Sequence, residues 1–532
     1  MIFRPRKRGL QYPAWAVAAL LAVVYLLIAP PSADLAAQEY RVSLFAQHGF
    51  LLWDNSWYGG HDLPGYSILF PPVGALLGPR LAGALCAVAS AWLFERVALA
   101  HFGERARPGA LWFAAAAAFV PLVTGRLTFA MGLAFGLAAV LAAQRRRDGL
   151  AVAAAACTTL ASPVAGLFVA MGAVAWLLSS RTPRAIWLGL GALVPAVILT
   201  VAFPEGGSEP FVGSAFWPAL LALAAAGLAL PREERVLRTA CWTYLFATVA
   251  SFVLKTPMGG NATRLAALAA GPLLACALWR RRPALLALLA LPLIYWQAYP
   301  PARDWIRAND DPSIQRVYYG PLLQRLAREP GPFRIEIPLT KNHWEARWVA
   351  SRYAMARGWE RQLDVGRNKL FYDGKLNSVR YRRWLDENAV AYVAVPDVPL
   401  DPSARTEAWV VTHRHVPGLH LIWRSAHWRL YRVRHATPLV SAPAKVTRLG
   451  PDDVALTSPR PATVTLRVPF TSYWSIVRGA GCVEGGRRGW TRLRLATPGS
   501  FLLRTSFSLG RVAQDGPRCT SGLPLGTDRP RR

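Results

Sequence analysis

The stretch GALWFAAAAAFVPLVTGRLTFAMGLAFGLAAVLAA, residues 109–143, decides the fold class. It consists of two apolar runs joined by a tight connection that contains a single charged residue, Arg126. A helix needs roughly 17–25 mainly apolar residues to cross the hydrocarbon core of a membrane. The stretch therefore predicts two consecutive membrane-spanning helices.

Similar runs fill the first 298 of the 532 residues, and they make the chain 53% hydrophobic and only 17% charged. This composition excludes a soluble enzyme and a disordered chain. We predict about eleven spans near residues 14–30, 79–98, 109–124, 127–143, 149–162, 164–179, 186–203, 215–230, 239–254, 265–279 and 284–298. Residues 1–298 are thus interpreted as an α-helical polytopic membrane domain with one long connection, 31–78.

Basic residues fix the predicted orientation, because Lys and Arg are retained on the cytoplasmic side of a membrane. Most of those in the first 298 residues fall in one alternating set of connections, which begins with Arg4, Arg6, Lys7 and Arg8. We therefore expect the N-terminus inside and everything after the last span outside. Glu95 lies at the inner end of a span, where we expect it to be solvated.

The remaining residues contain no run long enough to span and carry short alternating segments separated by Pro and Gly, which are typical of strands. We expect an exported mixed α/β domain over 299–440, with helices in IQRVYYGPLLQRLARE and NSVRYRRWLDEN, and a β-sandwich over 441–532. Only two cysteines, Cys482 and Cys519, lie in this exported part. Two thiols in an oxidising compartment most simply form one disulfide.

The long connection 31–78 holds polar residues that a bilayer does not explain. On a helix begun by Ser32, one face carries a mainly polar stripe made of Asp34, Gln38, Arg41, Phe45 and His48. This pattern predicts an amphipathic helix along the outer membrane surface, with the Asp34 carboxylate beside the mouth of the first span.

A carboxylate just after the first span, the loop motif LWDNSWYGG, many short-looped spans and an exported C-terminal part together resemble the GT-C superfamily of integral-membrane glycosyltransferases. The segments GRLTFAMGLAFGLAA (125–139) and SPVAGLF (162–168) look like parts of bacterial membrane proteins grouped with it. The resemblance implies a lipid-phosphate-linked sugar as donor and an acidic residue of the first outer loop as catalytic base. Asp34 matches that position, and Glu39 is the alternative. The loop lacks the metal-binding Asp-x-Asp of the oligosaccharyltransferase branch, so we expect no metal and no cofactor besides the lipid-linked donor.

Transfer from a lipid phosphate also requires cations around the departing phosphate. Arg126, Lys255 and Arg264 lie on the outer side, which the charge rule disfavours, and they are the candidates for binding the phosphate. The alternative interpretations are structural: Asp34 caps the loop helix, and the three cations reach out to lipid headgroups.

Aromatic side chains beside charged ones suggest where sugars bind, since a sugar offers a ring face for stacking and hydroxyls for hydrogen bonds. Such residues occur in the loop and in TKNHWEARWVASRYAMARGWERQLD (340–364). The structural alternatives are an interfacial aromatic belt for Trp57 and Tyr58 and a hydrogen-bond pair within the loop for His61 and Asp62. For the 340–364 segment the alternative is a seam of ion pairs between the domain and the membrane. The acceptor or sugar-binding candidates are Trp57, Tyr58, His61, Asp62, His343, Glu345, Arg357, Trp359, Glu360 and Arg361. The later SYWSIVRGAGCVEGGRRGW (472–490) resembles carbohydrate-binding or supporting sandwich modules.

These observations favour a membrane glycosyltransferase in a bacterial plasma membrane. It would move a sugar from a polyprenyl phosphate to an envelope polysaccharide or glycolipid at the outer face. The alternatives are a transporter or flippase of a lipid-linked precursor and a non-catalytic polysaccharide-binding scaffold. From residue 299 onward, 38 Lys and Arg face 19 Asp and Glu, and outside a membrane this surplus favours anionic lipids or acidic polymers over nucleic acid.

Overall fold

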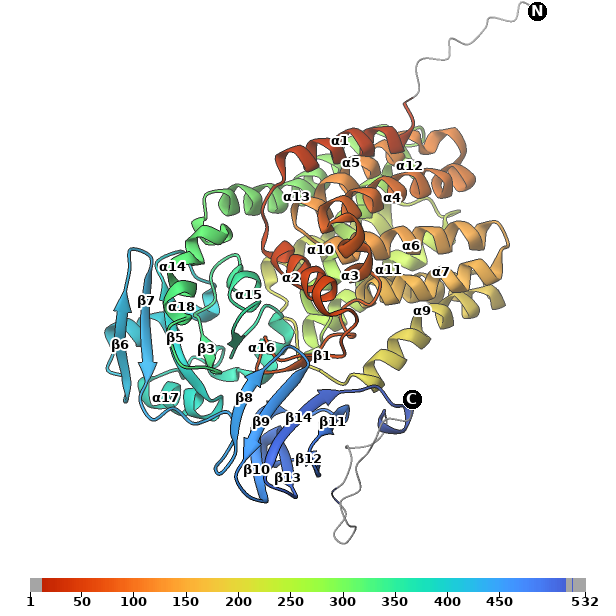
Figure 1. Ribbon diagram of the computed structural model, residues 1–532. Coiled ribbons are helices and arrows are strands. Elements are labelled where there is room, and N and C mark those ends of the chain that lie inside the picture. Colours follow the sequence, from red (N-terminus) through yellow and green to blue (C-terminus); the bar gives the residue numbers. More distant parts are fainter. Residues whose placement is uncertain (1–11, 513–518, 520–532) are drawn as a thin grey trace, which may run out of the picture. The chain divides into compact units, whose positions relative to one another are not determined.

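The computed structural model describes residues 12–512 and Cys519 (Figure 1). The chain divides into two compact units, each built from segments that are distant in sequence. The helical unit comprises the chain up to Gln38 together with Ser67–Ala196 and Pro210–Asn309. The mixed unit comprises Glu39–Tyr66, Val197–Glu209 and the chain from Asp310 onward.

Apolar helices make up the helical unit, and within the described residues each of the eleven predicted spans coincides with one helix. These helices are α1 (Ala14–Ile28), α4 (Pro79–Phe102), α5 (Arg107–Val123), α6 (Leu127–Gln144), α7 (Asp148–Ala161), α8 (Pro163–Ser180), α9 (Pro183–Ala202), α10 (Gly213–Ala229), α11 (Arg235–Val253), α12 (Arg264–Leu278) and α13 (Pro283–Asn309). A short helix, α3 (Phe70–Leu77), and the 3₁₀ turns η1 (Gly103–Ala106) and η2 (Gly259–Thr263) lie between them.

Seven helical segments of the described chain are long and apolar enough to cross a membrane. The number is smaller than eleven because α4 and α5 count as one continuous segment and because α1, α7 and α10 have only 15, 14 and 17 residues. α1 and α2 (Ala33–His48) add an eighth candidate, bent by 82° between the two helices. The chain is thus a multi-pass membrane protein by helix length and composition, whereas eleven spans and an inside N-terminus stay predictions. Arg4, Arg6, Lys7 and Arg8 lie outside the described residues.

Small residues allow close packing between helices of this unit. A Cβ atom on Gly109 of α5 would lie only 2.9 Å from the backbone nitrogen of Cys276 in α12. Such close approach of helix backbones is typical of packing in a membrane, where water supplies no driving force.

Glu95 departs from the sequence-based expectation of a solvated position. It is buried, it accepts a 3.2 Å hydrogen bond from the Ala14 backbone nitrogen, and it lies 3.8 Å from Arg107. The acid therefore caps α1.

The predicted loop helix is present as α2, directly after Ser32. The chain passes from the helical unit to the mixed unit within this helix, between Gln38 and Glu39. Gln38 and Arg41 of the expected polar stripe are only 1% and 4% exposed. Arg41 is buried because it pairs with Glu360 within the mixed unit, a contact between residues 319 positions apart that helical periodicity does not reveal.

The first part of the mixed unit is an α/β domain with a five-stranded sheet in the order β4-β3-β5-β7-β6. β4, β3 and β5 are parallel, and β7 and β6 continue the sheet in antiparallel fashion. The strands are β3 (Arg334–Glu336), β4 (Ala354–Met355), β5 (Val390–Pro396), β6 (Leu419–Arg424) and β7 (Trp428–Val433). The helices are α14 (Arg316–Leu326), α15 (Glu345–Trp348), α16 (Arg361–Arg367), α17 (Ser378–Glu387) and α18 (Pro402–His413). α14 and α17 coincide with the two segments expected to be helical.

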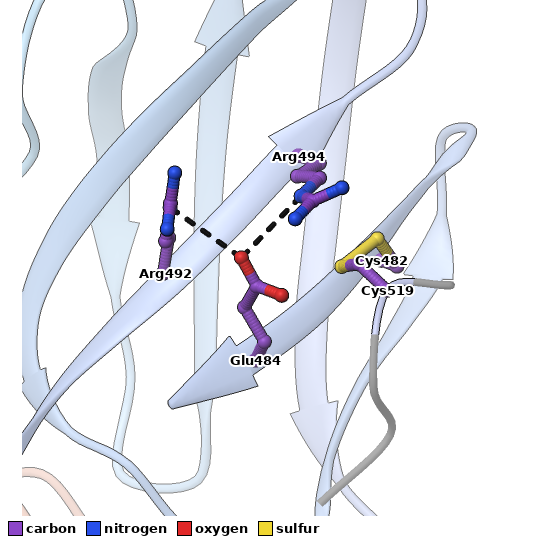
Figure 2. Close-up of a disulfide and its surroundings, with 5 residues drawn as sticks. All are labelled: Cys482, Glu484, Arg492, Arg494 and Cys519. Atoms are coloured by element: carbon purple, nitrogen blue, oxygen red, sulfur yellow. Dashed lines mark hydrogen bonds and ion pairs between the residues drawn. A yellow bond between two sulfur atoms is a disulfide. The ribbon is translucent and has the colours of Figure 1, made fainter. Parts of the chain in front are cut away.

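The second part is a β-sandwich of a three-stranded sheet, β10-β13-β12, and a four-stranded sheet, β11-β14-β9-β8. Its strands are β8 (Lys445–Leu449), β9 (Asp453–Ser458), β10 (Ala462–Pro469), β11 (Trp474–Arg478), β12 (Gly481–Gly485), β13 (Trp490–Leu495) and β14 (Gly499–Thr505). β1 (Trp53–Asp54) and β2 (His61–Asp62) form a hairpin in the loop. Trp53 of this hairpin belongs to the sandwich core, where it lies beside Trp474. Cys482 of β12 and Cys519 form a disulfide, the pairing expected from the sequence (Figure 2).

Candidate active site in the helical unit

Asp34 and Arg126, 92 positions apart in sequence, form an ion pair in the helical unit. The Nε atom of Arg126 donates to Oδ2 of Asp34 over 3.0 Å. Both side chains are partly open, with 23% of Asp34 and 36% of Arg126 exposed. Because the contact uses only Nε, the two terminal nitrogens of the guanidinium are left to donate to another anion.

The connection between α5 and α6 places Arg126 against the start of α2. Gly125 has φ +73°, and a Cβ atom at this position would lie only 2.5 Å from the backbone nitrogen of Leu35. Glycine is therefore required both by the left-handed backbone and by the close approach to α2. This geometry holds Arg126 within reach of Asp34, which lies in the first turn of α2.

Arg264 lies at the start of α12, and its guanidinium carbon is 5.8 Å from the centre of the Phe129 ring. Phe129 is in the first turn of α6, three residues after Arg126. Buried Tyr244 of α11 fixes the start of α12, because its hydroxyl donates to the Ala262 carbonyl and accepts from the Ala266 nitrogen at 3.0 Å. The first turns of α6 and α12 thus each carry an arginine, at helix ends whose dipoles also favour anions.

An apolar cavity of about 460 Å³ runs along α6 from this end of the unit. Phe129 and Leu265, the latter adjacent to Arg264, line one end, and Gln144 and His101 line the other. The lining between Phe129 and Gln144 covers ~22 Å of helix at 1.5 Å per residue. Side chains of α4, α6, α8, α11 and α12 form the walls, and nearly all of them are apolar.

The other two candidates of this group have different surroundings. Lys255 is exposed on the connection between α11 and η2. Glu39 belongs to the mixed unit, where its Oε2 atom lies 4.0 Å from Nε of Arg347. Among the predicted base and phosphate ligands, the Asp34 and Arg126 side chains are thus in direct contact.

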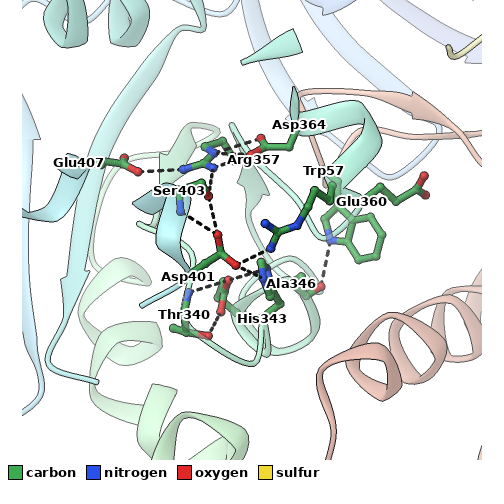
Figure 3. Close-up of polar contacts among 12 residues, drawn as sticks. Trp57, Thr340, His343, Ala346, Arg357, Glu360, Asp364, Asp401, Ser403 and Glu407 are labelled. Carbon is green, nitrogen blue, oxygen red and sulfur yellow. Dashed lines mark hydrogen bonds and ion pairs between the residues drawn. The ribbon is translucent and has the colours of Figure 1, made fainter. Parts of the chain in front are cut away.

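Arg357 is the centre of a second, fully buried set of ion pairs, in the mixed unit (Figure 3). Its Nη2 atom lies 2.5 Å from Asp364, and its Nη1 atom lies 3.0 Å from Glu407. Burial alone would lower the pKa of the Arg357 guanidinium, but the two carboxylates hold that pKa well above its usual value. Burial raises the pKa of nearby Glu336, and the Glu407 carboxylate raises it further.

His343, Glu345 and Arg361 lie in a neighbouring polar cluster that also contains Asp401 (Figure 3). The His343 Nε2 atom is 3.5 Å from Asp401, which also pairs with Arg361. Burial would raise the pKa of Asp401, but the hydrogen bond from His343 and the Arg361 guanidinium lower it far below its usual value. Burial raises the pKa of Glu345, which accepts hydrogen bonds from Thr340.

The aromatic loop residues are buried within the mixed unit. The Trp57 indole donates to the Ala346 carbonyl at 3.0 Å, and the Tyr58 hydroxyl donates to the Glu360 carbonyl at 2.7 Å. His61 is fully buried, and burial lowers its pKa well below the usual value, so the ring is neutral near pH 7. These positions exclude an interfacial aromatic belt at Trp57 and Tyr58.

Of the predicted sugar-binding residues, Asp62, Trp359 and Arg361 are the ones that are only partly buried. Burial raises the pKa of Asp62 to about 7, although the Arg367 guanidinium opposes the increase. Burial also raises the pKa of Glu360, and the positive charge of Arg41 opposes this increase.

Several residues of these clusters were not identified as site candidates from the sequence. Asp401 and Glu407 lie in α18 or at its cap, far from the 340–364 segment, and nothing in their local sequence marks them. Arg41 did carry a signal, because it is an outer basic residue two helical turns after Asp34. Within residues 12–512 and Cys519, no three His, Cys, Asp or Glu side chains are grouped so as to hold a metal ion.

The chain was compared with protein families, with curated proteins and with solved structures. No protein-family model matches the chain, and no curated protein matches it. Among solved structures, the chain is similar to arabinofuranosyltransferase AftD from Mycobacteria, with a TM-score of 0.44 and 18% sequence identity. The match covers 79% of this chain, which spans only 39% of that protein.

Proposed function

We propose that the protein is a membrane glycosyltransferase that moves a sugar from a polyprenyl-phosphate donor to an envelope glycan or lipid acceptor. The observation that carries the proposal is a partly exposed carboxylate–guanidinium pair, Asp34 with Arg126, three residues before Phe129, which lines an apolar cavity. A lipid phosphate has the matching chemistry, since its anion suits the arginines and its hydrocarbon tail suits the cavity.

In this proposal Asp34 is the catalytic base. Its carboxylate takes the proton of an acceptor hydroxyl while that oxygen forms a bond to the anomeric carbon of the donor sugar. The bond from the anomeric carbon to the phosphate oxygen breaks, and the lipid phosphate leaves with the electron pair. Arg126 orients the Asp34 carboxylate through Nε and receives the phosphate on its terminal nitrogens.

Arg264 is the second phosphate ligand, and it stabilises the charge that grows on the leaving group. Lys255 is retained as a further ligand on the connection that precedes Arg264. Acceptor binding is assigned to the mixed unit, where Asp62, Trp359 and Arg361 are open to a ligand. His343, Glu345, Arg357 and Glu360 are buried, and we assign them to positioning those residues.

The test is mass spectrometry of the lipids that co-purify with the protein, followed by incubation with labelled donors and candidate envelope acceptors. A co-purifying polyprenyl phosphate and a glycosylated product support the proposal. A lipid without phosphate, or a donor that is bound but never used, contradicts it. The second outcome would favour the non-catalytic scaffold.

A further inference from the structure

The outer face of the three-stranded sheet carries an excess of positive charge. Along β13, Thr491, Leu493 and Leu495 point into the core, whereas Arg492 and Arg494 point outward with 49% and 42% of their side chains exposed. Alternation along a strand places residues two apart on the same face. We call this surface the arginine face; it comprises Thr463, Thr465, Glu484, Trp490, Arg492 and Arg494.

A single carboxylate serves both arginines of this face (Figure 2). Oε1 of Glu484 lies 3.4 Å from Nε of Arg492 and 3.3 Å from Nε of Arg494. Among the described residues, Arg492 and Arg494 thus share one carboxylate, and the terminal nitrogens of both guanidinium groups are left to bind a second anion. Exposed ion pairs are weak, so an incoming anion faces little competition.

Hydroxyl groups stand in register with these cations. Thr463 pairs with Arg494, and Thr465 pairs with Arg492. The two Thr–Arg rows are two residues apart along the strands, which corresponds to roughly 6.6 Å. Trp490 lies on the same face two residues before Arg492. Repeated cations, hydroxyls and an aromatic ring are what an anionic sugar polymer needs, since its sugars supply acidic groups, hydroxyls and ring faces.

The four-stranded sheet provides an internal comparison. There Arg448 lies 2.7 Å from Asp453, and Arg504 lies 3.9 Å from Asp452 and 3.5 Å from Asp453. Two arginines face two carboxylates, so this surface has no excess charge at these positions. The comparison between the two sheets therefore concerns these arginine pairs: Arg492 and Arg494 share one carboxylate, whereas Arg448 and Arg504 have two.

We propose that the arginine face binds an acidic glycan through carboxylate or phosphate groups on the polymer. The threonine hydroxyls and Trp490 favour a sugar chain over a lipid headgroup. This interaction is separate from sugar transfer and does not depend on Asp34.

The experiment measures binding of decameric oligogalacturonate, a uronic acid polymer, to the full-length protein in nanodiscs of zwitterionic lipid. Neutral maltodecaose is the matched uncharged probe. We expect Arg492→Gln/Arg494→Gln to weaken oligogalacturonate binding about tenfold or more, because two charge-assisted contacts are lost. The matched control, Arg448→Gln/Arg504→Gln, changes binding less than about twofold because its arginines are neutralised by aspartates.

Glu484→Gln supplies an independent arm, since it removes the carboxylate that pairs with both arginines and should strengthen binding about threefold or more. The Glu484→Gln measurement remains informative even if the melting midpoint of Arg492→Gln/Arg494→Gln shows that the double variant does not fold. Asp34→Asn should bind like the wild type, so failure of the transferase proposal leaves this result intact. The inference is overturned by equal binding of maltodecaose, by weaker or unchanged binding in Glu484→Gln, or by equal losses in both double variants. Binding of phosphatidylglycerol vesicles without any binding of oligogalacturonate would also overturn the inference and would identify a lipid surface instead.

Discussion

The two ion-pair centres of the protein use the same chemical groups in opposite settings. Arg126 and Asp34 form one contact, and both are partly exposed. Arg357 has two carboxylate partners, and all three side chains are at most 1% exposed. A pair that water reaches can exchange partners with a substrate, whereas a buried one cannot be separated without leaving a charge uncompensated. On this difference rests our proposal that the first centre takes part in chemistry and the second supports the structure.

The largest effect is expected on transfer when the exposed pair loses its acid. Asp34→Asn keeps the shape of the side chain but cannot accept the acceptor proton, so transfer should fall by about 10²–10⁴-fold, or about 3–5 kcal/mol. Thermal stability should change little. Initial rates with a labelled polyprenyl-phosphate sugar measure this, with Glu39→Gln as the control for the alternative base. A near-normal rate in Asp34→Asn together with a large loss in Glu39→Gln would reverse the assignment.

Removing the buried cation should instead destabilise the fold. Arg357→Met leaves Asp364 and Glu407 buried without a counter-charge, and the free energy of unfolding should fall by about 3–4 kcal/mol. Denaturant titration in detergent, followed by tryptophan fluorescence, measures the change. Arg488→Met is the matched control, because Arg488 and its partner Glu387 are 72% and 40% exposed and the change should cost at most about 1 kcal/mol. Equal losses in the two variants would remove the distinction between buried and exposed pairs.

A buried acid of the mixed unit should make stability depend on pH. Burial raises the pKa of Asp54 from 3.8 to about 6, against hydrogen bonds from Ser56 and Tyr40. The folded state therefore holds a proton that the unfolded chain has lost, so the contribution of Asp54 to stability is highest below pH 4 and decreases by about 2–3 kcal/mol as the pH rises to 6. Asp54→Asn should remove this part of the decrease. Unfolding titrations at pH 4, 5, 6 and 7 measure it, and an identical slope in the variant would contradict the assignment.

The smallest effect concerns the second phosphate ligand. Arg264→Gln should raise the donor KM about tenfold, or about 1.4 kcal/mol, because one charge-assisted hydrogen bond to the phosphate is lost. The acceptor KM should stay the same. Arg303→Gln is the control, since Arg303 lies on α13 in a local pair with Asp304. A donor KM that rises equally in both variants would indicate a general charge effect.

The positions of the helices and most strands could be predicted because apolar runs and alternation are local patterns. The burial of individual charged side chains could not be predicted. Glu95 and Arg41 are charged residues that local patterns assign to the surface, yet both are buried by partners distant in sequence. The chemical types at Asp34, Arg126 and Arg264 were predictable, but their contacts were not. No sequence pattern indicated the cavity, because its lining residues, such as Leu133, resemble any other apolar residue of a membrane span.

The most direct test of the account locates a bound lipid phosphate. Photo-cross-linking with a polyprenyl phosphate that carries a diazirine near the phosphate should label the first turns of α6 and α12, around Phe129 and Leu265. The Arg126→Gln/Arg264→Gln variant should lose this labelling. Labelling of the exposed faces of α9 or α13 instead, at residues such as Ile198 or Leu291, would show that the Asp34–Arg126 pair is not where the donor binds.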